Sequence, residues 1–129
     1  MSSYMKHLTE EWIAKAKGDY RVASREKSRK LPVYDAICFH AQQFVEKYMK
    51  AVLQESDIPF PKTHDLLLLL NLCSNLVPTL EEYRSEMAKL CVFAVNFRYP
   101  GEFAEPEDAL VAYSAMKKIR NVIRKHFLR

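Results

Sequence analysis

The stretch Cys38-Phe39-His40-Ala41-Gln42-Gln43-Phe44-Val45-Glu46-Lys47-Tyr48-Met49-Lys50-Ala51 decides the fold. It lies inside a longer segment, residues 33–54, which contains neither Gly nor Pro, so nothing in it breaks a helix. Apolar side chains recur along this segment at helical spacing: Ile37, Ala41, Phe44, Val45, Tyr48 and Val52. The segment therefore predicts a helix with one apolar stripe on which a core can form.

A second, polar face runs beside this stripe on the same helix. Its members are spaced three, four and three residues apart: His40, Gln43, Lys47 and Lys50. Residues at this spacing share a helix face, and all four side chains carry hydrogen-bond donors. Such a face is either an ordinary solvated surface or a place where an anionic or polar ligand binds.

The composition favours one all-α domain over residues 1–129. This length suits a single hydrophobic core, and 49% hydrophobic residues is too many for a disordered chain. Only two glycines are present, and alternating β-branched runs are rare. A net charge of +4 is compatible with an anionic partner, but it is far from the dense basic patch of a dedicated nucleic-acid binder.

Four more helices are expected along the chain. The first covers about residues 6–28 and the last about residues 106–126, while Thr63 and Thr79 are expected to cap the third and fourth. Pro-containing segments separate the helices. Short connections of this kind predict an up-and-down antiparallel bundle of about five helices.

Strict alternation of direction predicts where polar groups gather. The second helix would end, the third begin and the fourth end at one end of the bundle. That end would collect residues from three segments: Lys47, Lys50, Lys62, His64, Arg98 and Tyr99. The basic clusters at 25–30 and 124–129 would share the opposite end. Convergence of polar groups from separate segments is typical of a binding site.

Several motifs together resemble the HEPN domain. They are Phe39-His40-Ala41-Gln42-Gln43, Glu46-Lys47, Lys50-Ala51 and Thr63-His64-Asp65-Leu66, with Trp12, Ala16, Asp19 and Ala23 spaced like the first helix of that family. Arg98-Tyr99-Pro100 matches a step found in many small stand-alone prokaryotic members. The resemblance covers nearly the whole chain. It implies binding of nucleotides or RNA and pairing with a minimal nucleotidyltransferase.

The resemblance also raises metal-independent RNA cleavage. Many members carry an Arg and, after four to six intervening residues, a His suited to acid–base catalysis. Arg98 stands at what looks like the family's Arg position. The positions where the His is then expected hold Phe103, Ala104 and Glu105. Arg120 and His126 meet the spacing at the end of the last helix, and Arg98 with His64 forms another candidate pair.

Other chemistry is disfavoured by the sequence. The histidines lack metal-ligand spacing, and neither a Gly-rich phosphate loop nor a Gly-x-Ser-x-Gly elbow occurs, so we expect no metal and no cofactor. Cys38, Cys73 and Cys91 lie among apolar residues without a Cys-x-x-Cys motif, which indicates buried free thiols in a reducing cytoplasm. The apolar run at 66–70 is too short to span a membrane, so we expect a soluble cytoplasmic protein.

The sequence thus predicts a non-catalytic, toxin–antitoxin-like HEPN module that binds nucleotide or RNA phosphate. The expected ligand-binding residues are His40, Gln43, Lys47, Lys50, Lys62, His64, Arg98 and Tyr99. Arg98 would grip phosphate and Tyr99 would stack on a base, unless Arg98 only caps its helix and Tyr99 packs in the core. The leucine-rich third helix predicts a homodimer. The alternatives are a ribonuclease toxin and a purely structural helical dimer.

Overall fold

The computed structural model describes residues 6–128, and these form an all-α structure without strands. In chain order its elements are α1 (His7–Lys27), α2 (Tyr34–Glu55), α3 (Leu66–Cys73), the 3₁₀ helix η1 (Pro78–Tyr83), α4 (Arg84–Asn96) and α5 (Pro106–Phe127). The predicted all-α class and the five helices are confirmed in this range. No helix within it is long and apolar enough to cross a membrane.

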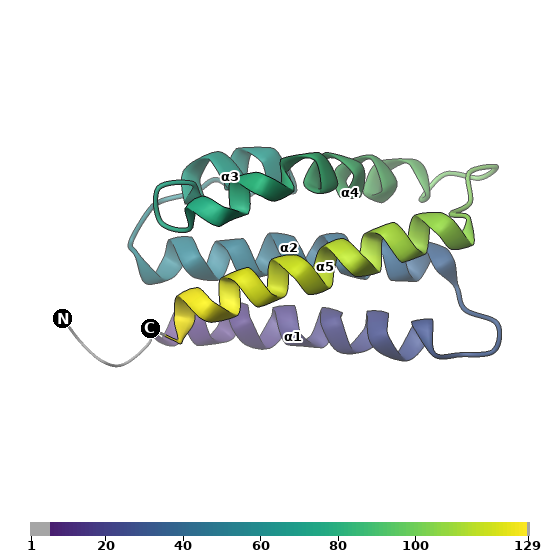
Figure 1. Cartoon of the computed structure of the whole chain (residues 1–129), viewed down its shortest axis with the longest axis horizontal. Coiled ribbons are helices and arrows are strands. Elements are labelled where there is room, and N and C mark those ends of the chain that lie inside the picture. The colour runs from purple at the N-terminus through teal and green to yellow at the C-terminus, as the bar shows by residue number, and fades with distance from the viewer. Residues whose placement is uncertain (1–5, 129) are drawn as a thin grey trace.

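α2 is the central helix of the bundle. The helices α1, α3, α4 and α5 all pack against it, and Figure 1 shows it between α1 and the layer of α3 and α4. All six residues of its predicted apolar stripe are buried. Because its neighbours also enclose its polar side, Gln42, Glu46 and Lys50 are buried as well. Buried polar groups need hydrogen-bond partners, and these partners shape the candidate site described below.

α1 runs antiparallel to α2 over most of its length (Figure 1). Its inward residues include the fully buried Ala16 and Ala23, whose small side chains let the two helices approach closely. Asp19 lies between them on the same face and is buried too. Trp12 packs edge-on against Phe60 of the loop after α2, with ring centroids 6.1 Å apart. α1 thus brings a carboxylate to the α1–α2 interface.

The loop after α2 turns back along that helix. His64, near the end of the loop, hydrogen-bonds to Glu46, and the thiol of Cys73 at the end of α3 donates to the carbonyl of Met49. α3 therefore begins beside the middle of α2 and runs in the same direction. The expectation that the third helix begins where the second ends is wrong, because the ten residues 56–65 are long enough to reach back.

This one reversal changes which ends of the helices meet. α4 ends next to the first half of α2, so Arg98 lies near Phe39 instead of near Lys47 and Lys50. α5 ends next to the start of α1, so the basic clusters at 25–30 and 124–128 lie at opposite ends of the bundle (Figure 1). The predicted gathering of six site residues at one end is therefore wrong.

Two predicted helix caps are also wrong. α3 is capped by Asp65, whose Oδ1 accepts hydrogen bonds from the amides of Leu67 and Leu68, while Thr63 Oγ1 accepts from the amide of Asp65. Thr79 lies inside η1, and α4 starts only at Arg84. Pro78 opens η1, where its missing N–H costs nothing.

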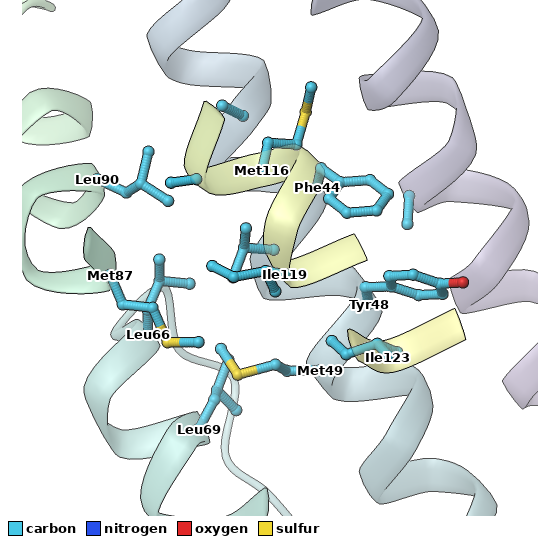
Figure 2. Packing of buried hydrophobic residues seen from close by; sticks show 14 of the residues in the cluster. Phe44, Tyr48, Met49, Leu66, Leu69, Met87, Leu90, Met116, Ile119 and Ile123 are labelled. Carbon is cyan, nitrogen blue, oxygen red and sulfur yellow. The ribbon is translucent and has the colours of Figure 1, made fainter. Parts of the chain in front are cut away.

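The leucine run of α3 faces the core more completely than its composition suggests. Leu66, Leu69 and Leu70 are fully buried, and Leu67 and Leu72 pack partly buried against the same core. Figure 2 shows Leu66 and Leu69 meeting side chains of α2, α4 and α5 in one continuous cluster: Met49, Met87, Leu90, Ile119 and Ile123. The run therefore does not form the exposed apolar surface on which the homodimer prediction rested.

The connection from α4 to α5 is shaped by two turn-forming features. Gly101 has a φ of 88°, a left-handed backbone conformation that residues with a Cβ atom rarely adopt. Glu105 then caps α5 in a reciprocal capping box with Asp108, and Pro106 occupies the first turn. Between them, the amide of Ala104 donates to Asp35 Oδ1 at 2.6 Å, which ties the loop to the start of α2.

Candidate functional site

Asp19 of α1 holds two of the four predicted polar-face residues. Its Oδ1 lies 2.8 Å from His40 Nδ1, and its Oδ2 accepts a hydrogen bond from Lys47 Nζ at 2.7 Å. Both partners lie on α2 and keep only about a quarter of their side-chain surface exposed. His40 and Lys47 therefore belong to a polar contact between α1 and α2, in which each already uses a nitrogen to bind Asp19.

Glu46 of α2 organises a second polar cluster. Its Oε2 accepts from Lys50 Nζ at 2.9 Å, and its Oε1 lies 2.9 Å from His64 Nδ1 and 3.2 Å from Gln42 Nε2. The ammonium of Lys50 also lies 5.3 Å from the ring centroid of Trp12, a cation–π contact. Lys50 is thus buried between a carboxylate and an indole ring, and little of it is exposed to a ligand.

These two carboxylates are the residues that reasoning from the sequence missed. Asp19 occupies an inward position of α1, spaced three residues from Ala16 and four from Ala23. A carboxylate at such a position indicates a buried cationic partner, because an unpaired buried charge is very costly. The signal was therefore present in the first helix. For Glu46 no local signal existed, since its position on α2 becomes interior only when α3 and α4 cover it.

A cleft of about 580 Å³ lies where α2, the start of α3 and the end of α4 meet. Its lining combines polar and apolar side chains from these segments: Phe39, Gln42, Gln43, His64, Asp65, Cys91, Ala94, Val95 and Arg98. Three of the eight predicted site residues, Gln43, His64 and Arg98, therefore come together here. Lys62 and Tyr99 are exposed outside the cleft lining, and the other three belong to the α1–α2 contact and the Glu46 cluster.

Arg98 both caps α4 and faces the cleft. Its Nε donates to the carbonyl of Ala94 at 3.1 Å, as expected for a residue that satisfies the last carbonyls of a helix. Its two terminal amino groups have no partner in the described part of the chain. The hydrogen bond from Nε thus fixes this planar side chain at the cleft and leaves both terminal amino groups available as donors. Tyr99 is 59% exposed and does not pack in the core.

Gln43 and His64 complete the polar side of the cleft. Gln43 Nε2 donates to Gln42 Oε1 at 2.8 Å, which fixes the amide and leaves Gln43 Oε1 as an acceptor. The His64 side chain is 80% exposed although Nδ1 contacts Glu46, so its Nε2 faces outward. Asp65 lies beside it but directs its carboxylate to the amides of α3. The amides of Leu67 and Leu68 are therefore not free to bind a phosphate.

The two arginine–histidine pairs differ in geometry. Arg120 and His126 are six positions apart on α5, which places them about 9 Å apart along the axis and on different sides of the helix. The Arg120 guanidinium stacks on the ring of Tyr20 at 4.5 Å, and His126 lies against Phe127. Arg98 and His64, in contrast, line the same cleft.

Burial governs the protonation of the cysteine thiols. Burial raises the pKa of Cys38 and of Cys73 from 9.0 to about 12 each, so both stay protonated and unreactive. Cys91 lines the cleft, and burial raises its pKa too. Within residues 6–128, no group of three His, Cys, Asp or Glu side chains is arranged to hold a metal ion.

Comparison with known protein families identifies the family of this chain. A family model described as the HEPN domain matches residues 9–126, a range that includes Asp19, Glu46, the cleft and Arg98. The chain belongs to the HEPN domain family. No curated protein and no solved structure matches it. The helical bundle described above is thus a HEPN domain over nearly its whole length, and its cleft residues come from the matched range.

In this HEPN chain, the positions after Arg98 where a catalytic His was expected hold other residues. Phe103 is 72% exposed, Ala104 is anchored through its amide to Asp35, and Glu105 caps α5. The side chains of Phe103 and Ala104 cannot transfer protons. The carboxylate of Glu105 could, but it is already bound in the helix cap. The loop after Arg98 therefore serves to start α5 and contributes no imidazole.

Proposed function

We propose that this chain is a non-catalytic HEPN module that binds nucleotide or RNA phosphate in the cleft, and that it acts with a minimal nucleotidyltransferase in a toxin–antitoxin-like pair. One observation carries the proposal: Arg98 lines the cleft and is held at Nε by the Ala94 carbonyl, while its two terminal amino groups have no partner in the described part of the chain. A pre-positioned guanidinium can bind two phosphate oxygens in bidentate fashion, which Lys cannot do.

The surrounding residues fit a nucleotide more fully than a bare phosphate. Phe39 is 43% exposed at the cleft and offers a ring on which a base could stack, a contact worth about 1–3 kcal/mol in single-strand recognition. The free Oε1 of Gln43 can accept a hydrogen bond from a base amino group or a ribose hydroxyl. Phosphate, sugar and base would each have a partner from a different part of the cleft.

Titration of ATP, GTP and a short RNA, followed by backbone amide shifts, tests the binding site. We expect shifts at Phe39, Gln43, His64 and Arg98, and clearly weaker binding in Arg98→Lys, which keeps the charge but loses the fork. Lys89→Gln on the exposed face of α4 is the matched control and should bind normally. Unchanged binding in Arg98→Lys would reduce Arg98 to a helix cap.

The partner is tested separately. Co-expression with a minimal nucleotidyltransferase encoded by an adjacent reading frame should yield a stable complex through purification. If no such neighbouring gene exists, or if the two proteins separate during purification, the pairing part of the proposal fails. The phosphate site is tested independently by the titration.

A ribonuclease is the second candidate, supported by one contact. Glu46 holds His64 at Nδ1 and leaves Nε2 outward, the arrangement in which a carboxylate orients a histidine for acid–base catalysis. Arg98 lines the same cleft and could bind the scissile phosphate. The exposed position of His64 argues against an efficient site, because water has free access to it.

A further inference from the structure

A second groove separates α1 from α5 on a different part of the bundle. Both helices pack along α2 but come near each other mainly through side chains, and the space between them has a volume of about 660 Å³. Its floor is apolar and includes Phe44 and Tyr48 of α2. Figure 2 shows Tyr48 extending from α2 toward α1. This α1–α5 groove shares no lining residue with the cleft at Arg98.

Four cations line the rim of the α1–α5 groove. Lys17 and Arg21 are one turn apart on α1, and Arg120 and Arg124 are one turn apart on α5, against a single acidic lining residue, Glu10. None of the four forms an ion pair within residues 6–128. Elsewhere the bundle pairs its inward cations with Asp19 and Glu46. Unpaired like charges facing one groove repel one another, and an acidic occupant would relieve that repulsion.

The aromatic floor is not arranged to stack on bases. Phe44 and Tyr48 are buried and packed against each other with centroids 4.9 Å apart. One face of Tyr20 is covered by the Arg120 guanidinium at 4.5 Å. Single-strand recognition depends on exposed ring faces, so the groove does not fit a nucleic acid well. The apolar lining residues that stay partly exposed, Ile13, Tyr20 and Phe127, instead favour an apolar occupant.

The dimensions fit a helix. The lining residues of α1 extend from Glu10 to Arg21, about 17 Å or three helical turns. An amphipathic helix laid in such a groove would place its apolar stripe on the floor and its flanking carboxylates on the rim cations. A second copy of this chain is a poorer occupant, because it carries a net charge of +4.

We propose that the α1–α5 groove is a docking site for an acidic amphipathic helix of a partner protein, held by Lys17, Arg21, Arg120 and Arg124. Burial raises the pKa of the Tyr48 hydroxyl, and the charges of Arg124 and Arg120 act against that rise, which indicates that both guanidinium groups lie close to the floor. This docking site is independent of phosphate binding at Arg98, because the two sites have no residue in common.

A synthetic helical peptide of about four turns, with a Leu stripe at i, i+3, i+4 and i+7 and Glu on the flanking positions, tests the proposal. Binding is measured by fluorescence polarisation and located by amide shifts in the full chain. We expect shifts along α1 and α5, affinity that falls with added salt, and a loss of at least about tenfold in Arg21→Glu/Arg124→Glu. A peptide with Lys in place of Glu should not bind.

The matched control is Lys15→Glu/Lys118→Glu, which changes the net charge equally at exposed positions outside the groove. Circular dichroism verifies that both double variants stay helical. Equal loss of binding in the control, or no shifts along α1 and α5 at about 1 mM peptide, would overturn the proposal. Displacement of the peptide by an oligouridine strand would also overturn it, because the groove would then bind RNA. A dimer that dissociates only in the groove variant would overturn it too, because the groove would then bind a second copy of the chain.

Discussion

His64 Nδ1 lies 2.9 Å from Glu46 Oε1, although the two residues are 18 positions apart and separated by the loop that follows α2. The contact joins the end of this loop, just before α3, to the middle of α2 and gives His64 a fixed ring position at the cleft. The same carboxylate holds Lys50, so one buried side chain supports both the candidate site and the fold.

We expect no RNA cleavage by the purified chain in the presence of EDTA. The loop after Arg98 has no histidine, and Arg120 and His126 face different sides of α5. A labelled single-stranded RNA incubated with the wild-type chain and resolved on a denaturing gel checks this. Cleavage lost in both His64→Ala and Arg98→Ala but retained in His126→Ala would instead establish the ribonuclease alternative.

The Lys50→Met substitution should destabilise the fold strongly. It removes the ammonium that is buried between Glu46 and Trp12, and breaking a buried ion pair costs about 3–5 kcal/mol. Urea unfolding followed by circular dichroism gives the free energy of unfolding. Lys62→Met is the matched control, since Lys62 is exposed and its substitution should change stability by no more than about 0.5 kcal/mol. A similar small change in Lys50→Met would show that the buried pair contributes little.

We expect a homodimer that forms through the exposed face of α4 and not through the leucines of α3. Val92 and Val95 of α4, and Tyr99 just after it, are large and more than half exposed, and Val95 and Phe39 line the cleft. Exposed apolar side chains gathered on one helix face are typical of interfaces. Sedimentation at about tens of micromolar should give a dimer for the wild type and a monomer for Val95→Asp.

The control for this dimer is Leu110→Asp on α5, a substitution of an equally exposed apolar residue on another helix. It should leave the dimer intact. A monomeric wild-type chain under the same conditions would contradict the prediction, and dissociation by both variants would mean that the effect is not specific to α4.

The stability of the fold should fall as the pH rises above 9. Burial raises the pKa of Cys38 and Cys73 from 9.0 to about 12 each. Between these values the folded chain retains protons that the unfolded chain has lost, so the free energy of unfolding decreases by up to about 1.4 kcal/mol per pH unit for each thiol. Urea unfolding at pH 7, 9 and 10.5 measures the decrease.

Tyrosines and lysines also titrate in this range, so the control is Cys38→Ala/Cys73→Ala. We expect its stability to depend less on pH between 9 and 10.5 than that of the wild type. An identical slope in the two proteins would mean that the thiols are accessible in the folded state. Slow labelling of both thiols by a disulfide reagent at pH 8 gives an independent check of their burial.

The helices were predictable because their signals are local. The apolar stripe from Ile37 to Val52 repeats at 3.6 residues, and Pro32, Pro78 and Pro106 lie at or just before helix starts. Such patterns depend only on neighbours in the chain, so they determine the element boundaries within a few residues. The HEPN relationship was likewise readable, because its motifs are short segments in a fixed order.

The candidate site was only partly predictable, because its residues depend on helix direction. Gln43, His64 and Arg98 were expected and do meet, but through a different arrangement from the one the alternation of helices suggested. Lys47 and Lys50 were expected at the site and are instead bound by Asp19 and Glu46. A charge pattern on one helix does not reveal which carboxylate a neighbouring helix will supply.

The sequence by itself determined the five helices of residues 6–128 and their apolar core, because the apolar stripe on α2 is buried only if other helices with apolar stripes pack against it. Only the tertiary structure decided that α3 runs parallel to α2. The loop at 56–65 carries no periodic pattern and is long enough to lead in either direction, so packing of Leu66, Leu69 and Leu70 against α2 and α4 selects the outcome. That selection brings Arg98 to Phe39 and Arg120 to Tyr20, and it thereby creates both the cleft and the α1–α5 groove.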